Sequence, residues 1–204
     1  PPPEIEKLSI VSEEWCLWAM SFLVDGMEQE LSRQIMNAAA FSGHLGALKY
    51  WKEGTRAKKK KRLFDEQTCA FAALGGQMEV LVWLRENNCP WDEYTCRCAA
   101  YGGHLEVLKY AHEHRCPWNQ LSCQEAALGG QLEVLKYAHE HGCPWNEWTC
   151  HKAAEGGHLE VLKYLHEKGC PWNEETCYRA AKGGHFEVLK YAHEKGCPWN
   201  ERTC

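Results

Sequence analysis

The hydrophobic positions of this chain fall into short stretches with the spacing of an α-helix. In one such stretch Cys150, Ala153 and Ala154 stand at i, i+3 and i+4, which places them on one helical face. Small side chains on that face let a second helix approach closely. Asn146 precedes the stretch and suits a helix N-cap, and Glu147 adds a negative charge where the helix dipole favours one. The pattern predicts a short helix that begins after Asn146.

Two glycines interrupt this pattern, and a second helical stretch follows them. Leu159, Leu162 and Leu165 fall on its apolar face, whereas Glu160 and Lys163 fall on its polar face. Glycine tolerates the tight turn that joins the two stretches. We therefore predict a unit of helix, tight turn, helix and loop, with the three leucines inward.

This unit recurs along the chain with a fixed period. Cys-Pro-Trp triplets follow one another every 27 residues, beginning at Cys89, Cys116, Cys143, Cys170 and Cys197. The Gly-Gly pairs keep the same spacing, at 75/76, 102/103, 129/130, 156/157 and 183/184. A period of this length is typical of a solenoid, in which each unit buries its apolar face against its neighbours.

At this point the residues resemble a known family. The sequence Ala-Ala-Glu-Gly-Gly-His-Leu-Glu-Val-Leu-Lys at 153–163 is similar to the A-A-x-x-G-H-x-E-V-V core of the ankyrin repeat, and Gly-Cys-Pro-Trp-Asn at 169–173 is similar to its G-A-D-V-N. The resemblance covers roughly residues 32–204 and implies an all-α, ankyrin-like helix-turn-helix solenoid. Leucine-rich repeats permit the same period, but their strand signature is missing.

The unit departs from the usual ankyrin repeat in three ways. Cysteine replaces the leucine of the first helix, and the T-P-L-H tetrapeptide is absent. The unit is also six residues shorter than the usual 33, and the shortfall lies where the family has a projecting β-hairpin. We expect the loop tryptophans to cover the junction between successive helix pairs in its place; they are Trp91, Trp118, Trp145, Trp172 and Trp199.

The chain divides into a leader with a cap, residues 1–31, and the repeat array, residues 32–204. Residues 13–24 form an apolar stretch that is too short to span a bilayer, and we expect it to be a helix that covers the open end of the array. The first unit carries six extra residues within 55–62, where a standard repeat has its hairpin. Because Cys204 falls inside the first helix of a further unit, we expect more repeats to follow.

Positions that differ between otherwise copied units lie on the first helix. Counted from the Asx cap, they are the second, fifth, sixth and ninth residues, a spacing that forms one stripe. The resemblance places this stripe on the concave side, where ankyrin proteins usually bind partners, and we expect it to be exposed. The alternative is that these surface positions changed without selection after the repeats were duplicated. Such changes favour polar residues, whereas many residues of the stripe are apolar or aromatic. The predicted protein-binding residues are Phe71, Leu74, Tyr94, Arg97, Tyr101, Leu121, Leu128, Trp148, His151, Lys152, Tyr178, Arg179 and Lys182.

Composition bears on the partners and the cellular compartment of the protein. The formal net charge is −5, so the whole molecule does not favour nucleic acid, and no apolar run is long enough for a transmembrane segment. Eleven of the 13 cysteines are repeat positions, which indicates packed, reduced thiols. We expect an intracellular, reducing compartment, with the cytoplasm first; an organelle stays open because the chain begins without methionine.

Histidine and cysteine recur together, as in His166, Cys170 and Cys177. Each such set offers three ligands, whereas a structural zinc site needs four that converge, and no C-x-x-C occurs. We therefore expect no metal and no cofactor. A regulated disulfide between the loop and helix cysteines is equally disfavoured in a reducing compartment.

One segment is strongly basic, with Arg56, Lys58, Lys59, Lys60, Lys61 and Arg62 within seven residues. Such a run is most often a solvated loop, and it also suits docking on an acidic partner, nucleic acid or anionic lipid. Catalytic motifs are missing, so we expect no enzyme. We expect a scaffold that binds another protein or a multi-subunit complex. The alternatives are a structural or linker subunit of a larger assembly and an electrostatic nucleic-acid binder that uses the basic segment.

Overall fold

The computed structural model describes residues 12–17, 29–56 and 64–203. Helices are the regular elements of this part of the chain, and it contains no strand, which confirms the predicted all-α solenoid. The helices are α2 (Gln29–Ser42), α3 (Leu45–Arg56), α4 (Glu66–Leu74), α5 (Met78–Glu86), α6 (Glu93–Gly102), α7 (Leu105–Glu113), α8 (Gln120–Leu128), α9 (Leu132–Glu140), α10 (Glu147–Glu155), α11 (Leu159–Glu167), α12 (Glu174–Lys182), α13 (Phe186–Glu194) and the 3₁₀ turn η2 (Glu201–Thr203).

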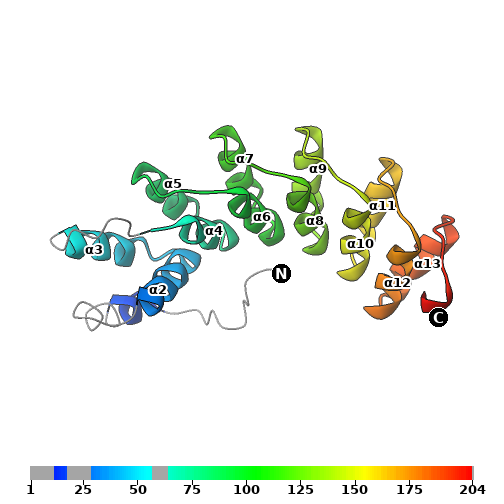
Figure 1. Cartoon of the computed structure of the whole chain (residues 1–204), viewed down its shortest axis with the longest axis horizontal. Coiled ribbons are helices and arrows are strands. Elements are labelled where there is room, and N and C mark those ends of the chain that lie inside the picture. The colour runs from blue at the N-terminus through cyan, green and yellow to red at the C-terminus, as the bar shows by residue number, and fades with distance from the viewer. Residues whose placement is uncertain (1–11, 18–28, 57–63, 204) are drawn as a thin grey trace.

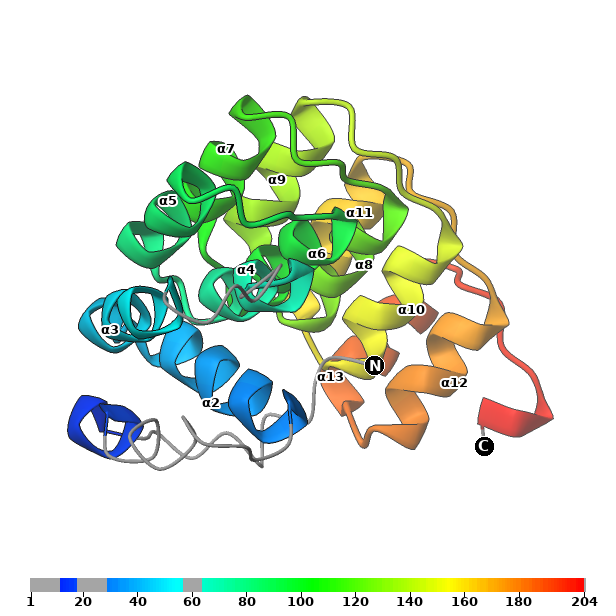
Figure 2. The same ribbon diagram turned by 60° about the vertical axis from the view of Figure 1, so that its left-hand side comes forward.

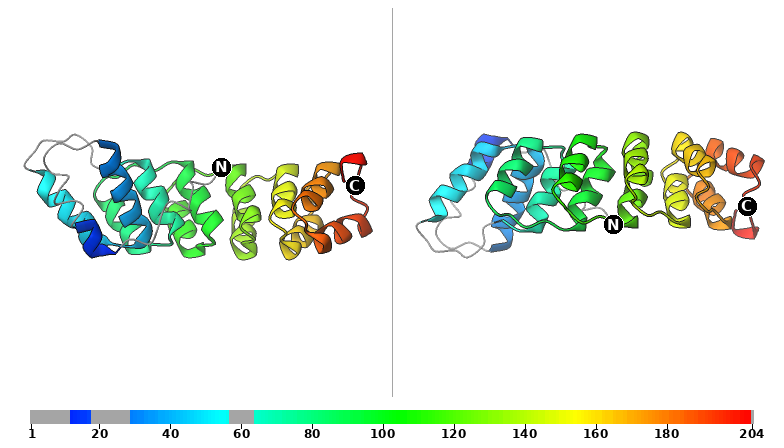
Figure 3. Two further views of the ribbon diagram at one scale, coloured as in Figure 1. Left: turned by 90° about the horizontal axis from the view of Figure 1, so that it is seen from below. Right: turned by 90° about the horizontal axis from the view of Figure 1, so that it is seen from above.

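The helix pairs stack along one axis and form a curved array (Figure 1). The even-numbered helices, here called the inner helices, pack side by side along the concave side, and the odd-numbered outer helices lie along the convex side. The views from below and above show the pairs following one another in an elongated row (Figure 3). Each inner helix therefore has a neighbour from the next unit on its flank.

Small residues make this close packing of the inner helices possible. Cys150, Ala153 and Ala154 of α10 are all fully buried, as predicted. In the outer helix α11, Leu162 and Leu165 are also fully buried. The buried face of α11 is turned slightly from the predicted one, because Val161 is 2% exposed while Leu159 is only half-buried.

The Asx residues cap the inner helices from α4 to α12. The Asn146 carboxamide oxygen accepts a hydrogen bond from the Trp148 amide at 3.2 Å, and the Asn146 amide donates to the Thr149 hydroxyl at 3.4 Å. This reciprocal arrangement is a capping box, which satisfies amides that a helix start would otherwise leave without partners.

Replacing Asn146 by alanine is expected to lower the free energy of unfolding by about 1 kcal/mol, because the first amides of α10 lose their acceptor. Urea unfolding measures that loss, and hydrogen exchange locates it. The amides of Trp148 and Thr149 are expected to exchange faster in the variant than in the parent. Unchanged exchange at both amides would contradict the capping assignment.

The two glycines between the helices have separate roles. A side chain at Gly156 would come within 2.6 Å of the Leu128 carbonyl oxygen in the preceding unit, so only glycine permits this approach. Gly157 has φ of +74°, a backbone conformation that favours glycine. His158 follows, and its Nε2 donates to the same Leu128 oxygen at 2.9 Å. The turn thus connects each unit to the one before it.

The loop cysteines tie each loop to the start of its own unit. The Cys170 thiol donates to the carbonyl oxygen of Asn146 at 3.4 Å, and the Cys150 thiol lies 4.0 Å from the carbonyl oxygen of Cys170. The hydrogen bond to Cys170 and then burial raise the pKa of Cys150, which favours the protonated thiol. The cysteines of the described residues are buried and free of disulfides. They act as small packed residues that also supply weak hydrogen bonds.

The loop tryptophans connect adjacent units on the convex side. The Trp145 indole stacks on the imidazole of His139 with ring centroids 3.5 Å apart and meets Tyr164 of the next unit edge-on at 6.3 Å. The ring is half-buried and packs against the core. The tryptophan therefore lies between consecutive helix pairs, as predicted.

A helical turn at residues 13–17 packs against the first unit (Figure 2). Cys16 is fully buried, and a carboxylate oxygen of Glu13 accepts a hydrogen bond from the Ala47 amide at 3.1 Å. The later units have glutamate where this unit has Gly46, and a side chain at Gly46 would require the Glu13 carboxylate to move. The rest of the expected cap, residues 18–24, lies outside the described residues.

Candidate protein-binding surface

The residues predicted to bind a partner lie on the inner helices α4, α6, α8, α10 and α12. These helices are side by side along the concave side of the array (Figure 1), so their variable positions form one strip across five units. We call this strip the helix-one surface.

Exposure varies strongly along the helix-one surface. Trp148 is 45% exposed, which is high for an indole, and Lys182 is also exposed. The half-buried members are Phe71, Tyr94, Arg97, Tyr101, Leu121, Leu128, Lys152, Tyr178 and Arg179. The accessible surface is therefore made mainly of aromatic and apolar side chains around Trp148, with basic residues toward α12.

The expected exposure is wrong for two members of this surface, because the structure buries them. Leu74 is 5% exposed and His151 is 3% exposed. The side chain at the fifth helical position turns toward the next inner helix rather than toward solvent. The His151 Nε2 thus lies 2.8 Å from the carboxamide oxygen of Asn173, the residue that caps α12. Leu74 ends α4 where His104 of the next unit packs, with its Nε2 2.9 Å from the Leu74 carbonyl oxygen.

The chemistry of His151 follows from this position. The Asn173 oxygen also accepts from the Glu175 amide, so it is an acceptor and the His151 Nε2 carries the proton. The other ring nitrogen, Nδ1, is buried without a hydrogen-bond partner. Burial lowers the pKa of His151, which keeps the ring neutral. His151 supports the Trp148 indole edge-on at 5.2 Å and contributes to the surface through that contact.

Comparison with known proteins identifies the repeat. Two overlapping segments, residues 123–166 and 150–193, match the family model described as ankyrin repeats (many copies). Residues 123–193 are therefore similar to ankyrin repeats. The crystal structure of the human ASB11 ankyrin repeat domain matches at a TM-score of 0.61 and 17% identity, over 80% of this chain and 84% of that chain. This match shows that the ankyrin fold extends beyond the segments matched by sequence. No curated protein sequence matches the chain.

Charges on the helix-one surface of this ankyrin-like solenoid largely neutralise one another. On α10 and α12, Glu155 accepts from Lys152 at 3.0 Å and from Arg179 at 3.3 Å, and Arg179 also reaches Glu175 at 2.8 Å. Between α6 and α8 Arg97 pairs with Glu125 at 2.9 Å. The charged residues thus bridge neighbouring ankyrin units, and the aromatic residues remain the distinctive chemistry of this face.

Tyr94 illustrates how the aromatic residues are held in the ankyrin array. The Arg97 guanidinium lies over its ring, 5.3 Å from the centroid. Burial raises the pKa of Tyr94 to about 12, so its hydroxyl stays protonated. The ring offers an apolar face together with a hydrogen-bond donor, a combination that is common in protein interfaces.

The other candidate sites are less informative. Arg56 ends α3, but its side chain and the remaining basic residues, Lys58, Lys59, Lys60, Lys61 and Arg62, lie outside the described residues. Within the described ranges, no three His, Cys, Asp or Glu side chains converge as metal ligands would. None of the described helices is both long and apolar enough to cross a bilayer.

Sequence reasoning missed a cavity on the convex side. Lys49, Lys52 and Glu53 of α3 line it together with Trp83 of α5. The sequence contained a signal for this cavity. Later units have histidine or arginine at the position of Lys52, and tryptophan at the position of Phe64.

Proposed function

We propose that the chain is a non-catalytic scaffold that binds another protein through the helix-one surface around Trp148. The observation that carries this proposal is the 45% exposure of Trp148 on α10, within the concave strip. A large indole left in water is unfavourable, and tryptophan is among the residues most often found at the energetic centre of an interface. Ankyrin repeats typically bind proteins, which supports the same conclusion.

The surroundings of Trp148 fit a partner with apolar side chains. Leu121 and Leu128 lie on the inner helix before it, and Tyr178 lies on the inner helix after it; all three are half-buried. Because the nearby charges pair among themselves, binding to this part of the surface gains little from a strongly charged partner. The partner proposed here therefore packs apolar or aromatic groups against the exposed side of the inner helices.

The same proposal includes the division of the chain into segments and its cellular compartment. Residues 1–31 act as a leader and cap, and residues 32–204 act as the array, with units 27 residues apart as a shortened form of the ankyrin repeat. The Glu13 contact with the first unit supports the cap. Buried, protonated thiols suit a reducing, intracellular compartment.

The test is to capture partners with the whole chain and then measure affinity with variants. Trp148→Ala is expected to weaken the captured partner's binding at least about tenfold, as for a central interface residue. Tyr50→Ala is the matched control, because Tyr50 is also an aromatic residue, 54% exposed, but lies on the outer helix α3.

Three results separate this proposal from the alternatives. Equal affinity for the Trp148→Ala variant and the parent would contradict a role for the helix-one surface. An equal loss in the Tyr50→Ala variant would place the interface on the convex side instead. Binding that disappears when 56–62 is neutralised, and that falls steeply with salt, would favour an electrostatic partner such as nucleic acid.

A further inference from the structure

The junctions between regular units share one arrangement on the convex side. A residue of the outer helix stacks on the loop tryptophan of its own unit; His112 and Trp118 do so with centroids 4.0 Å apart. That tryptophan then meets a tyrosine of the next unit edge-on, as Trp118 meets Tyr137 at 6.3 Å. The rings thus connect two successive outer helices.

The first junction has different residues at these positions. Phe64 stands where the later units have tryptophan, and Lys52 stands where they have histidine or arginine. Phe64 keeps the edge-on contact with the next unit, since its ring is 5.6 Å from that of Trp83. The Lys52 ammonium instead lies 5.7 Å from the centroid of the Trp83 ring and donates to the carboxamide oxygen of Asn87.

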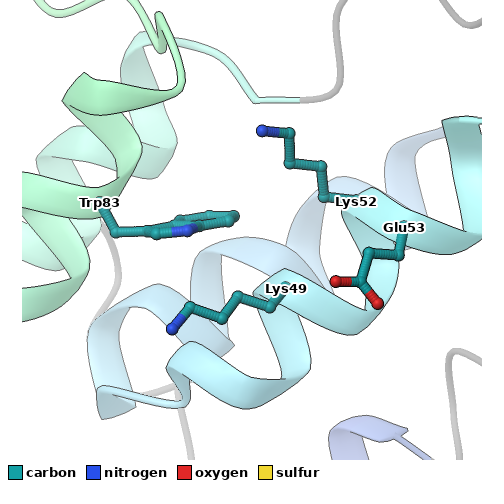
Figure 4. A pocket seen from close by; sticks show the side chains of 4 residues that line it. All are labelled: Lys49, Lys52, Glu53 and Trp83. Carbon is teal, nitrogen blue, oxygen red and sulfur yellow. The ribbon is translucent and has the colours of Figure 1, made fainter.

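A cavity of about 250 Å³ lies at this junction, lined by Lys49, Lys52, Glu53 and Trp83. Figure 4 shows the flat Trp83 indole projecting from α5 toward the lysines of α3, with Lys52 on one side of the ring plane and Lys49 on the other. Glu53 lies farther along α3. At this junction lysine and phenylalanine stand where the regular junctions have a stacked histidine or arginine and a tryptophan.

We propose that this cavity binds a single aromatic ring that carries an anionic group, such as an aryl phosphate. The ring packs against the half-buried Trp83 indole, in place of the second ring that the regular junctions contain. The anion is held by the ammonium group of Lys52, on the same side of the indole plane as the bound ring, through charge-assisted hydrogen bonds. The positive charge of Lys49, on the other side of the plane, adds to the attraction. Glu53 disfavours a second anionic group at the far end of the site.

The size of the site limits the ligand to one ring. Pockets for drug-sized molecules are typically about 300–1,000 Å³, and this cavity is smaller. The same chemistry occurs in a free aryl phosphate and in a phosphorylated tyrosine of a peptide. The site lies between outer helices, away from the helix-one surface, so it is independent of the proposed scaffold function.

The experiment is a titration of the full ¹⁵N-labelled chain with phenyl phosphate, followed through the indole N–H signals in NMR spectra. The Trp83 signal, assigned with a Trp83→Phe variant, is expected to shift and saturate. Phenol and inorganic phosphate are the matched half-ligands, and each is expected to bind at least about tenfold more weakly, because each lacks one of the two contacts. If inorganic phosphate binds as tightly as phenyl phosphate, the aromatic part of the proposal is wrong.

Variants decide whether the four lining residues form the site. The double variant Lys49→Gln, Lys52→Gln is expected to bind phenyl phosphate at least about tenfold more weakly than the parent. The control variant Lys109→Gln, at the position equivalent to Lys49 in a regular unit, is expected to bind it with unchanged affinity. Lys52→His with Phe64→Trp restores the regular residues and is expected to abolish binding by filling the cavity. Binding that survives both double variants would overturn the proposal. These variants change partly exposed side chains or restore the repeat pattern, so each is expected to fold.

One further arm identifies the source of the ligand. A short peptide with phosphotyrosine that binds more tightly than phenyl phosphate supports the site as one for a phosphorylated partner chain. Equal affinity supports a small aryl phosphate as the natural ligand. A peptide with unphosphorylated tyrosine that binds equally well would overturn the anionic requirement.

Discussion

We expect the Trp145→Ala variant to lose about 2–3 kcal/mol of its free energy of unfolding, since the half-buried indole gives up its contacts to two units at once. The stack on His139 and the edge-on contact with Tyr164 both disappear. In a solenoid, stability is approximately the sum of unit stabilities and nearest-neighbour interfaces. The loss therefore falls mainly on the interface between the α8–α9 pair and the α10–α11 pair.

Trp148→Ala is the control for this prediction, because the residue is also a tryptophan and lies three positions away. Its exposed ring contributes little to packing, so we expect a change of no more than about 0.5 kcal/mol. Urea melts measure both variants, and hydrogen exchange shows whether the units on either side of Trp145 uncouple. Equal destabilisation of the two variants would refute the division between a structural loop and a recognition surface.

Leu162→Ala is expected to have the largest effect, a loss of roughly 2–5 kcal/mol. Leu162 is fully buried between the outer and inner helices, and an alanine there leaves a cavity that close-packed neighbours cannot fill. Thermal or chemical unfolding gives the magnitude.

Lys163→Ala provides the matched comparison on the same helix. Lys163 pairs with Glu160 at 2.7 Å on the exposed side of α11, and a surface ion pair of this kind contributes little to stability. We expect a change within about 0.5 kcal/mol. A loss at Lys163 as large as that at Leu162 would mean that the buried face of α11 is assigned wrongly.

Several features of this protein could be predicted from the sequence because they depend on residues close together in the chain. The Asn146 cap joins positions within three residues of each other. The buried face of the inner helix α10 follows from the spacing of Cys150, Ala153 and Ala154. The fixed period of the glycine pairs and Cys-Pro-Trp triplets then determined that each unit meets a copy of itself. The ankyrin fold follows from these short-range rules applied repeatedly.

Other features were decided only when units packed against each other. His151 lies on the predicted stripe, yet its partner is Asn173, 22 residues away, and the close spacing of the inner helices leaves the imidazole no access to solvent. The cavity beside Trp83 likewise depends on how Lys52 and Phe64 meet a side chain from the next unit. Periodicity shows which face of a helix a residue occupies, but the distance between neighbouring helices determines whether that face is open or covered.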